Sequence, residues 1–472
     1  MGAALVALLL LSADLGDQAG TITKSRAGET PVMVEGVGVQ LTLTEETRAG
    51  ESPIVPGTDP QGFVAEVVTP LVGLELRRPT FTAQAFYGLR LYWQDPTPVV
   101  ATSTRALTPD LVSRIQGRSI SETTRSGALV LHSLGFTVHA RPARPLFFEL
   151  AGTGSVGSPD YTALTQVLRT NQSALPPVVR LATGLVHGSS ILQVAPRWEL
   201  TLAAELSAWE WLDVPDDLGA SAQIAGQTLV TSQTQVTVVP GVAYILTPRD
   251  DLGLGAALGE VWFSDGLAIA TVTPEVNWKR RLTQRNNLKL ILGLTFAHTE
   301  AVGLDVKDPL APGGSAVSPI GSFQLSSRLL GSRGITLQSD VNGGVDYYVD
   351  PVLGTALPRA EAAIGATLIA VPTWMVILQG SFATALKTPP PLTVVGQTLS
   401  ILPDETVFSV SLSGRRRISE NFFAELGGLY ADRGPVLSTP DFRFHQRQLW
   451  INFALTGTTR PISRQTLQQE QP

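Results

Sequence analysis

Histidine and serine are the residues whose side chains could carry acid–base or nucleophilic chemistry in this chain, which has no cysteine. His187 and Ser189 are two residues apart, so on a strand they would share a face, as the base and nucleophile of a hydrolase must. Two residues share a face by chance half of the time, so we expect no catalytic residues and keep a hydrolase only as an alternative. We also expect no metal site, because the histidines lack the spacing of metal ligands; they are His132, His139, His187, His298 and His445.

The segment GTGSVG at 152–157 matches a dinucleotide-binding fingerprint, in which glycines let the backbone approach a pyrophosphate. That fingerprint requires a following helix and a second parallel strand, and the sequence after 157 predicts neither. We therefore place these glycines in a strand and expect no cofactor. The 34 basic and 40 acidic residues give a net charge of −6 without a basic cluster, so we expect no nucleic-acid partner.

Charged side chains become informative through their alternation with apolar ones. In GITLQSDVNGGVDYYVD (334–350), one parity holds Ile335, Leu337, Val341, Val345, Tyr347 and Val349. The other parity is polar and includes Asp340, Asp346 and Asp350. Successive side chains of a strand point to opposite faces. The segment therefore predicts a strand about three times the usual length, with one apolar face and one wet, acidic face.

The same period of two recurs along the chain, for example at 80–93, 198–208 and 287–298. It predicts 18 strands, at 31–45, 62–77, 80–93, 127–141, 144–156, 179–195, 197–211, 230–247, 251–263, 265–280, 287–300, 316–331, 334–350, 357–371, 373–387, 404–416, 420–433 and 441–457. Eight short polar turns alternate with longer segments at 94–126, 157–178, 212–229, 301–315 and 388–403. Pro70, Pro240 and Pro274 fall inside predicted strands on the apolar parity, and we interpret them as a repeated bulge.

Composition points to a membrane environment that is crossed by strands. Charged residues make up 16% of the chain, against about 25% in typical soluble domains, and mean hydropathy is +0.17. After the first dozen residues no apolar run approaches the length of a membrane-spanning helix. An even number of strands, with short turns at one end and long loops at the other, is typical of an outer-membrane barrel. Since lipid offers no partner to an unpaired backbone group, the sheet must close.

The predicted fold is therefore all-β: a single transmembrane antiparallel up-and-down β-barrel of about 18 strands, with short periplasmic turns and long extracellular loops. The polar parity would face the lumen, and its candidate pore-lining residues are Arg90, Glu149, Glu199, Glu205, Glu275, Lys289, Asp340, Asp346, Asp350, Glu361 and Glu425. Tryptophans near strand ends would form aromatic girdles at the two membrane interfaces; they are Trp93, Trp198, Trp209, Trp211, Trp262, Trp278 and Trp374. Trp450, inside the last predicted strand on the polar parity, is the exception.

The two ends of the chain predict segments outside the barrel, which we place at 31–457. MGAALVALLLLS at the start resembles the apolar core of a secretory signal and predicts a signal peptide over 1–20. It lacks the usual basic region, so a start placed too far downstream, or a buried apolar stretch, stays an alternative. Residues 21–30 would form a periplasmic N-terminal segment, and 458–472 a polar periplasmic tail.

This plan resembles Gram-negative outer-membrane porins over about residues 31–457. The phrases AEVVTPLVGLELRRPTFTAQAFYGLRLYW and GFTVHARPARPLFFELAGTGS look like barrels of myxobacteria and related deltaproteobacteria. Some of those barrels have 18 strands and are linked to exopolysaccharide export. The resemblance implies the outer membrane of a Gram-negative bacterium, insertion by the barrel-assembly machinery, and periplasmic polysaccharide-export components as partners. The tail beyond Thr458 departs from the C-terminal phenylalanine of porins, which leaves the insertion route open.

The expected function is a polar, mildly acidic channel for passive diffusion or export of solutes. Its lipid partner is the outer membrane itself. Carboxylates on the polar parity select for cations in such pores, although the same charges could simply hydrate the wall. Segment 94–126 has helical spacing and could either constrict the pore or cap it. The pattern also admits a closed barrel acting as a tether or export scaffold and, less well, a secreted array of β-sandwiches.

Overall fold

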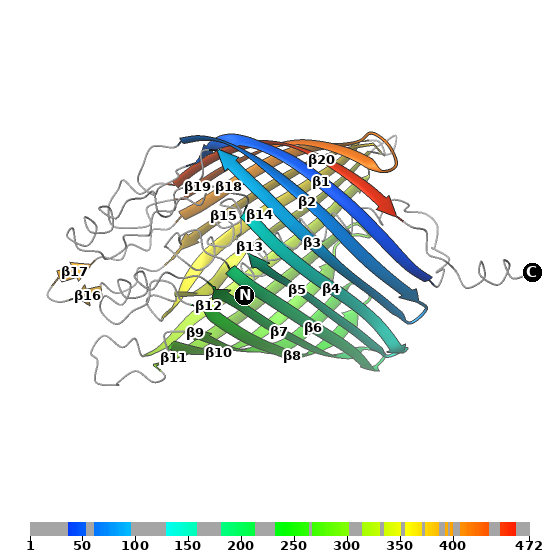
Figure 1. Cartoon of the computed structure of the whole chain (residues 1–472). Coiled ribbons are helices and arrows are strands. Elements are labelled where there is room, and N and C mark those ends of the chain that lie inside the picture. The colour runs from blue at the N-terminus through cyan, green and yellow to red at the C-terminus, as the bar shows by residue number, and fades with distance from the viewer. Residues whose placement is uncertain are drawn as a thin grey trace, which may run out of the picture.

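The computed structural model describes residues 36–52, 61–95, 129–157, 181–212, 232–263, 267–301, 314–330, 335–350, 355–370, 373–386, 392–394, 397–399, 406–433 and 444–458. Eighteen long strands form one wall (Figure 1). They are β1 Gly36–Ser52, β2 Gln61–Arg78, β3 Phe81–Asp95, β4 Leu129–Ala143, β5 Leu146–Gly157, β6 Leu181–Ala195, β7 Trp198–Trp211, β8 Gln233–Thr247, β9 Asp250–Phe263, β10 Leu267–Arg281, β11 Asn286–Ala301, β12 Gly314–Leu330, β13 Ile335–Asp350, β14 Thr355–Ala370, β15 Trp374–Ala385, β18 Thr406–Arg417, β19 Phe422–Arg433 and β20 Phe444–Thr458. The short strands β16 Leu392–Val394 and β17 Gln397–Leu399 form a separate hairpin.

The wall closes on itself because the first strand pairs with the last. β1 is antiparallel to β2 on one side and to β20 on the other, so Leu43 lies opposite both Pro70 and Leu455. Every other long strand pairs with its neighbours in the chain, as in an up-and-down barrel. Closure gives both sides of every strand a hydrogen-bonding partner, which is the condition for crossing lipid.

The two faces of the wall have opposite character. Outward-facing side chains are large and apolar, and Leu292 and Leu449 are each 66% exposed. Inward-facing positions carry small polar residues, such as the buried Thr237 and Thr295. A water-soluble protein has the reverse arrangement, so the outer face is built to contact lipid. Within the described residues, no helix has the length and apolar character needed to cross a membrane.

The strand count and the closed barrel confirm the predicted fold, and most strand bounds lie within two or three residues of the prediction. The largest difference is β1, which begins at Gly36 and continues to Ser52 instead of covering 31–45. The hairpin of β16 and β17 lies inside a segment that the sequence predicts as a loop. The predicted signal peptide, N-terminal segment and C-terminal tail, and residues 96–126 of the candidate plug, lie outside the described residues.

The predicted bulges at the three prolines are wrong. At each one, the pairing with the following strand skips two positions and resumes in the same register, as in Val68↔Leu91 followed by Leu71↔Gly88. Proline removes one ladder donor, and this wall accommodates the loss without inserting a residue. The register shifts lie beside short turns instead, at Ala140/Ala143, Gln193/Ala195 and Ile245/Thr247.

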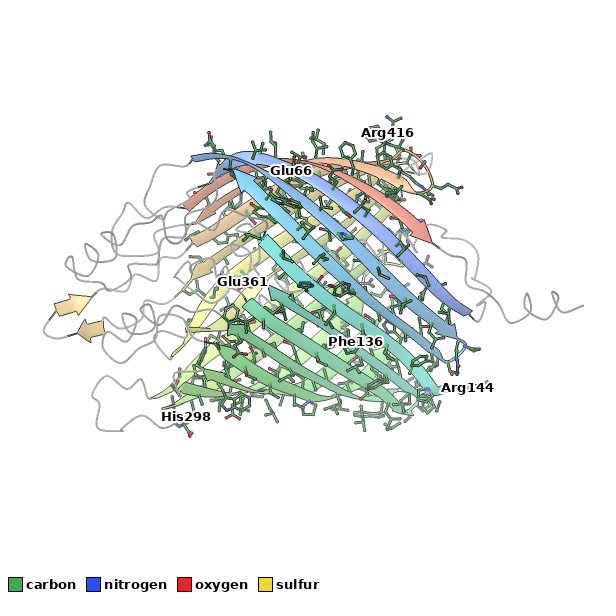
Figure 2. The ribbon with its side chains drawn as sticks, viewed as in Figure 1. Glu66, Phe136, Arg144, His298, Glu361 and Arg416 are labelled. Atoms are coloured by element: carbon green, nitrogen blue, oxygen red, sulfur yellow. The ribbon has the colours of Figure 1, made fainter. Side chains whose placement is uncertain are left out.

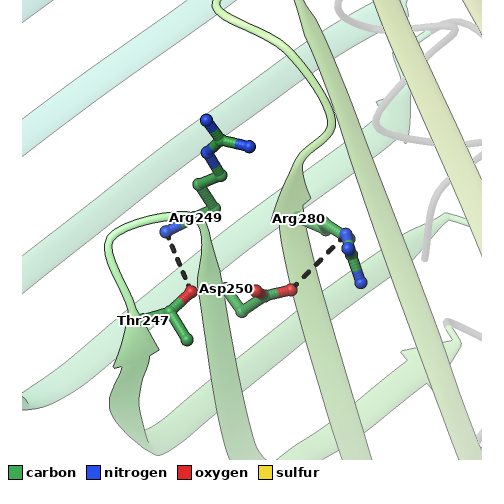
Figure 3. Close-up of polar contacts among 4 residues, drawn as sticks. All are labelled: Thr247, Arg249, Asp250 and Arg280. Carbon is green, nitrogen blue, oxygen red and sulfur yellow. Dashed lines mark hydrogen bonds and ion pairs between the residues drawn. The ribbon is translucent and has the colours of Figure 1, made fainter.

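The short turn between β8 and β9 shows how these tight connections are held (Figure 3). The hydroxyl of Thr247 accepts the backbone N–H of Arg249 at 3.1 Å and donates to a carboxylate oxygen of Asp250 at 2.9 Å. Arg280, on the neighbouring β10, lies 3.8 Å from the same carboxylate. One side-chain pair thus fixes the turn and ties it to the next strand.

Candidate functional site: the barrel lumen

Backbone alternation places the predicted pore-lining residues on the inner face of the wall. On β7, for example, Glu199 and Glu205 alternate with the exposed, outward Leu200, Leu202 and Leu206. The same alternation turns inward Arg90, Glu149, Glu275, Lys289, Asp340, Asp346, Glu361 and Glu425. Asp350, the last residue of β13, pairs with Thr355, and its side chain lies outside the described set. The lumen therefore carries charge on most parts of its wall.

Most of these carboxylates lie beside a cationic side chain. Arg415 donates to Glu425 through both Nη2, at 2.7 Å, and Nε, at 2.9 Å, from the neighbouring strand. Glu361 lies 3.5 Å from Arg359 on its own strand. Pairs of this kind stiffen the wall and reduce the net field inside the pore.

The histidine pairs are looser. His139 lies 3.7 Å from Glu149, and His187 lies 4.0 Å from Glu205, both on the inner face. Ser189 also faces the lumen, one pleat from His187, but no hydrogen bond joins the two among the described contacts. His132 faces outward, where its Nδ1 lies 2.8 Å from the hydroxyl of Tyr87. No group of three potential metal ligands occurs within the described part of the chain.

The inner face also carries charges that the sequence prediction missed. Arg48 and Glu46 on β1 form an ion pair directed inward, because β1 extends beyond its predicted end. Arg359 faces inward in register with Asp346. Both arginines fall on the polar parity, so the alternation itself was the signal that would have found them. They reduce the acidic excess expected from the sequence.

GTGSVG lies in β5, which pairs antiparallel with β4 and β6 through this whole segment. The glycines are therefore part of a barrel wall. Gly157, at the end of β5, has a φ of 140°, and a Cβ there would overlap the carbonyl of Val130. This close approach of two strands accounts for its glycine.

The tryptophans separate into outward-facing and inward-facing groups. Outward positions at strand ends are held by Trp93, Trp198, Trp262, Trp278 and Trp374. Trp209 instead shares the inner face with Thr183 and Gln233, so its place in an outward girdle was wrongly predicted. Trp211 is the last residue of β7, and its side chain lies outside the described set.

Trp450 faces the lumen from β20. Its indole covers Gly427 on the neighbouring β19, and a Cβ at that glycine would overlap the ring. The absence of a side chain at Gly427 therefore leaves space for the indole ring of Trp450 inside the barrel.

The outer part of β13 leaves the wall and enters the lumen. Its pairing with β12 ends at Val345↔Gly321, although β12 continues to Gly314 and stays paired with β11. The rest of β13 keeps a full ladder with β14, as far as Asp350↔Thr355. We call the end of this hairpin, residues 346–350 and 355–359, the inner hairpin. Its β13 strand has separated from β12 but stays paired with β14.

Tyr347 anchors the inner hairpin to the inner face of β10, three strands away in the wall. Continued alternation from Val345 predicts that Tyr347 faces lipid, and this prediction is wrong. Its hydroxyl donates to Thr271 on β10 at 3.1 Å, and its ring packs against an inward cluster on β9 to β11. That cluster consists of Val261, Phe263, Ile269 and Ala297. Because β11 and β12 lie between β10 and β13 in the wall, this contact reaches across the lumen side.

A second apolar cluster lies on the inner face at the loop end of β2 to β4. It consists of Phe63, Ala65, Val67 and Tyr92, with Leu129 packed against them. The run QGFVAEVV at the start of β2 has apolar residues on both parities, Phe63 and Val67 on one and Val64 and Val68 on the other, and this signal could have revealed the cluster. The loop end of the lumen is therefore lined partly by apolar side chains.

Comparisons with known proteins find no matching family model and no matching curated protein. Among solved structures, Acinetobacter baumannii OccAB2 aligns with a TM-score of 0.41 and 10% identity, over 90% of this chain and 98% of that chain. Pseudomonas aeruginosa OpdK with vanillate aligns with a TM-score of 0.42 and 10% identity, over 90% and 100%. A structure described as a bacterial polysaccharide outer membrane secretin aligns with a TM-score of 0.32 and 10% identity, over 89% and 98%.

The assignment of the chain follows from its own geometry. Eighteen antiparallel strands close into a barrel whose exterior is apolar and whose interior is polar. Even-numbered barrels of this construction span the outer membrane of Gram-negative bacteria. The chain is an outer-membrane β-barrel.

Proposed function

We propose that this barrel is a channel through which solutes cross the outer membrane. The observation that carries the proposal is the closure of 18 strands around an ion-paired, polar lumen. Barrels of this size leave an aqueous passage unless something fills them. If the interior were simply filled with packed side chains, we would expect it to be apolar, like the core of a soluble barrel. The observed interior is polar instead.

The inner hairpin is the proposed constriction of this channel. It brings Asp346 into electrostatic reach of both Glu275 on β10 and Glu361 on β14. Lys289 lies within electrostatic reach of Glu275, and Arg359 lies 3.5 Å from Glu361. A solute therefore passes three carboxylates and two cations beside the proposed constriction, which supports a modest cation preference.

The solute class is proposed as small and hydrophilic, moving by passive diffusion. Export of polysaccharide is a narrower version that rests on the sequence resemblance, with insertion by the barrel-assembly machinery and association with periplasmic export components. A closed barrel that serves as a scaffold is the second candidate, and the contact of Tyr347 with Thr271 favours it, because this contact holds the inner hairpin inside the lumen.

Planar-bilayer recording distinguishes the two candidates. The full chain, refolded in detergent and inserted into a bilayer, is expected to give steady single-channel currents. A reversal potential measured in a salt gradient is expected to show weak selectivity for cations. Heat-shifted electrophoretic mobility first establishes that the barrel is folded. Folded, inserted protein that passes no current would overturn the channel and leave the scaffold.

A further inference from the structure

Exposed arginines form a belt around the short-turn end of the barrel. We define the arginine belt as Arg78, Arg144, Arg197, Arg249, Arg280 and Arg416. Arg144, Arg197 and Arg249 lie in the turns after β4, β6 and β8. Arg78, Arg280 and Arg416 occupy outward positions near the same end, where they pair with Phe81, Leu288 and Trp374. Figure 2 shows Arg144 and Arg416 toward this end.

Two belt arginines are stacked on outward tryptophans. The guanidinium of Arg280 lies 5.7 Å from the ring centre of Trp278, and that of Arg416 lies 5.1 Å from that of Trp374. Outward tryptophans near strand ends sit at the boundary between hydrocarbon and headgroups. Arg280 lies two residues nearer the turn than Trp278, and Arg416 lies in register with Trp374. Both guanidinium groups therefore lie at this boundary, with their planar faces held by the indoles.

Few acidic groups neutralise the belt. At the same end, Asp250 pairs with Arg280 (Figure 3). Asp251 and Glu420 are also acidic. Glu75 and Glu199 point to the lumen, where Glu75 pairs with Arg77. Within the described part of the chain, no ion pair holds Arg144, Arg197, Arg249 or Arg416. The belt consequently keeps most of its positive charge available to groups outside the protein.

The outward face has the opposite charge at its loop end. Its exposed acidic residues in that half, within the described part of the chain, are Glu45, Glu51, Glu66, Glu210, Glu260 and Glu300, and the exposed Arg447 on β20 is a cation among them. Figure 2 shows Glu66 away from the end that carries Arg144 and Arg416. The barrel is therefore polarised along its axis, and the two lipid leaflets meet surfaces of opposite sign.

We infer that the arginine belt binds the phosphate groups of anionic phospholipids in the leaflet that surrounds the short turns. Guanidinium groups bind phosphate oxygens through paired, charge-assisted hydrogen bonds, and aromatic stacking fixes their orientation. Six such groups, spaced from β2 to β10 with one more on β18, suit several separate headgroups better than one protein partner, which would need a continuous patch. This inference is independent of conduction, because it concerns only the outer face of the inserted barrel.

The test measures which lipids surround the barrel. The refolded full chain is placed in vesicles of phosphatidylcholine with a quarter phosphatidylglycerol, and spin-labelled analogues of both lipids report their relative association with the protein. We expect a preference for phosphatidylglycerol of about fivefold, which corresponds to about 1 kcal/mol for a lipid that meets one arginine. The preference is expected to fall sharply at about 1 M salt, where charges are screened within a few ångströms.

Variants separate the belt from the rest of the surface. Arg→Gln at all six belt positions is expected to bring the ratio to about one, whereas Arg→Lys at the same positions keeps the charge and most of the preference. The matched control neutralises the other rim with Glu66→Gln, Glu210→Gln and Glu260→Gln, and is expected to retain the preference. Heat-shifted mobility confirms folding of each variant.

Three outcomes would overturn the inference. The wild-type barrel could show no preference between the two lipids, the Arg→Gln variant could retain it, or the control variant could lose as much as the belt variant. If the Arg→Gln variant does not fold, the salt dependence of the wild-type protein and the Arg→Lys variant still decide the question.

Discussion

Removing the hydrogen bond between Tyr347 and Thr271 should loosen the inner hairpin without changing its shape. Tyr347→Phe deletes the hydroxyl that donates across 3.1 Å, and Thr271→Val deletes the acceptor at nearly constant volume. Tyr347→Ala removes in addition the ring that packs on Val261, Phe263 and Ile269. The three variants therefore separate the polar contact from the apolar one.

The size of each effect follows from the contacts. A neutral hydrogen bond of this kind contributes about 1 kcal/mol, so losing it should raise the undocked population of the hairpin about fivefold. Truncating a packed aromatic ring to alanine costs about 3–5 kcal/mol. This loss is enough to make the undocked state dominant in the variant even where it is a minor state in the wild-type protein. Undocking widens the lumen, so the conductance should increase in the order wild type, Tyr347→Phe, Tyr347→Ala.

Single-channel recording measures the undocked population, as the frequency of high-conductance intervals, and the conductance of each state. Tyr347→Phe, Thr271→Val and their combination form a double-mutant cycle. Because either single change removes the whole bond, the double variant should behave like each single one. Tyr430→Phe, on an outward position of β19, is the control and should leave the current unchanged. Additive effects in the cycle, or an unchanged current in Tyr347→Ala, would refute the role of the hairpin as a constriction.

Two further substitutions test other parts of the wall. Leu292→Arg places a charge at an outward position near mid-membrane and should lower the free energy of unfolding in a bilayer by about 2–4 kcal/mol, whereas Ile291→Arg, on the lumen side of the same strand, should cost far less. Chemical denaturation in vesicles measures both, and equal losses would contradict the assignment of faces. Gly427→Ala drives a methyl group into the indole of Trp450 and should cost about 1–3 kcal/mol by the same measurement. Gly414→Ala, where nothing lies within 4 Å, is its control and should stay within about 0.5 kcal/mol of the wild-type value.

Period-two alternation was sufficient to predict the barrel because each strand separates two environments along most of its length. Where both faces meet similar surroundings, the alternation weakens. The start of β2 shows this: Phe63 and Val67 face inward while Val64 faces outward, so the sequence there is apolar on both parities. Strand ends are harder to predict for the same reason, as the continuation of β1 to Ser52, beyond its predicted end at 45, illustrates.

The inner hairpin could not be predicted from the sequence, because it depends on a contact between residues 76 positions apart. Within β13 the alternation continues through Tyr347 as though the strand remained in the wall. Only the loss of pairing with β12 reveals the departure. The alternation of residue types predicts which face a side chain would have if its strand stayed in a regular sheet. A long-range contact, such as that of Tyr347 with Thr271, can give the side chain a different environment.

The point of departure explains why the hairpin can leave the wall as a unit. Gly343 and Gly344 come just before the last pair with β12, and a Cβ at Gly344 would overlap the carbonyl of Gly321 and the backbone of Ser322. β12 and β13 therefore lie unusually close together immediately before they separate. Beyond this point the hairpin keeps its own ladder to the tip, so docking or undocking breaks no hydrogen bond between its two strands. The contacts that hold it in the lumen are those that Tyr347 makes with the inner face of β9 to β11, so we expect this one side chain to be the most direct control over the width of the lumen.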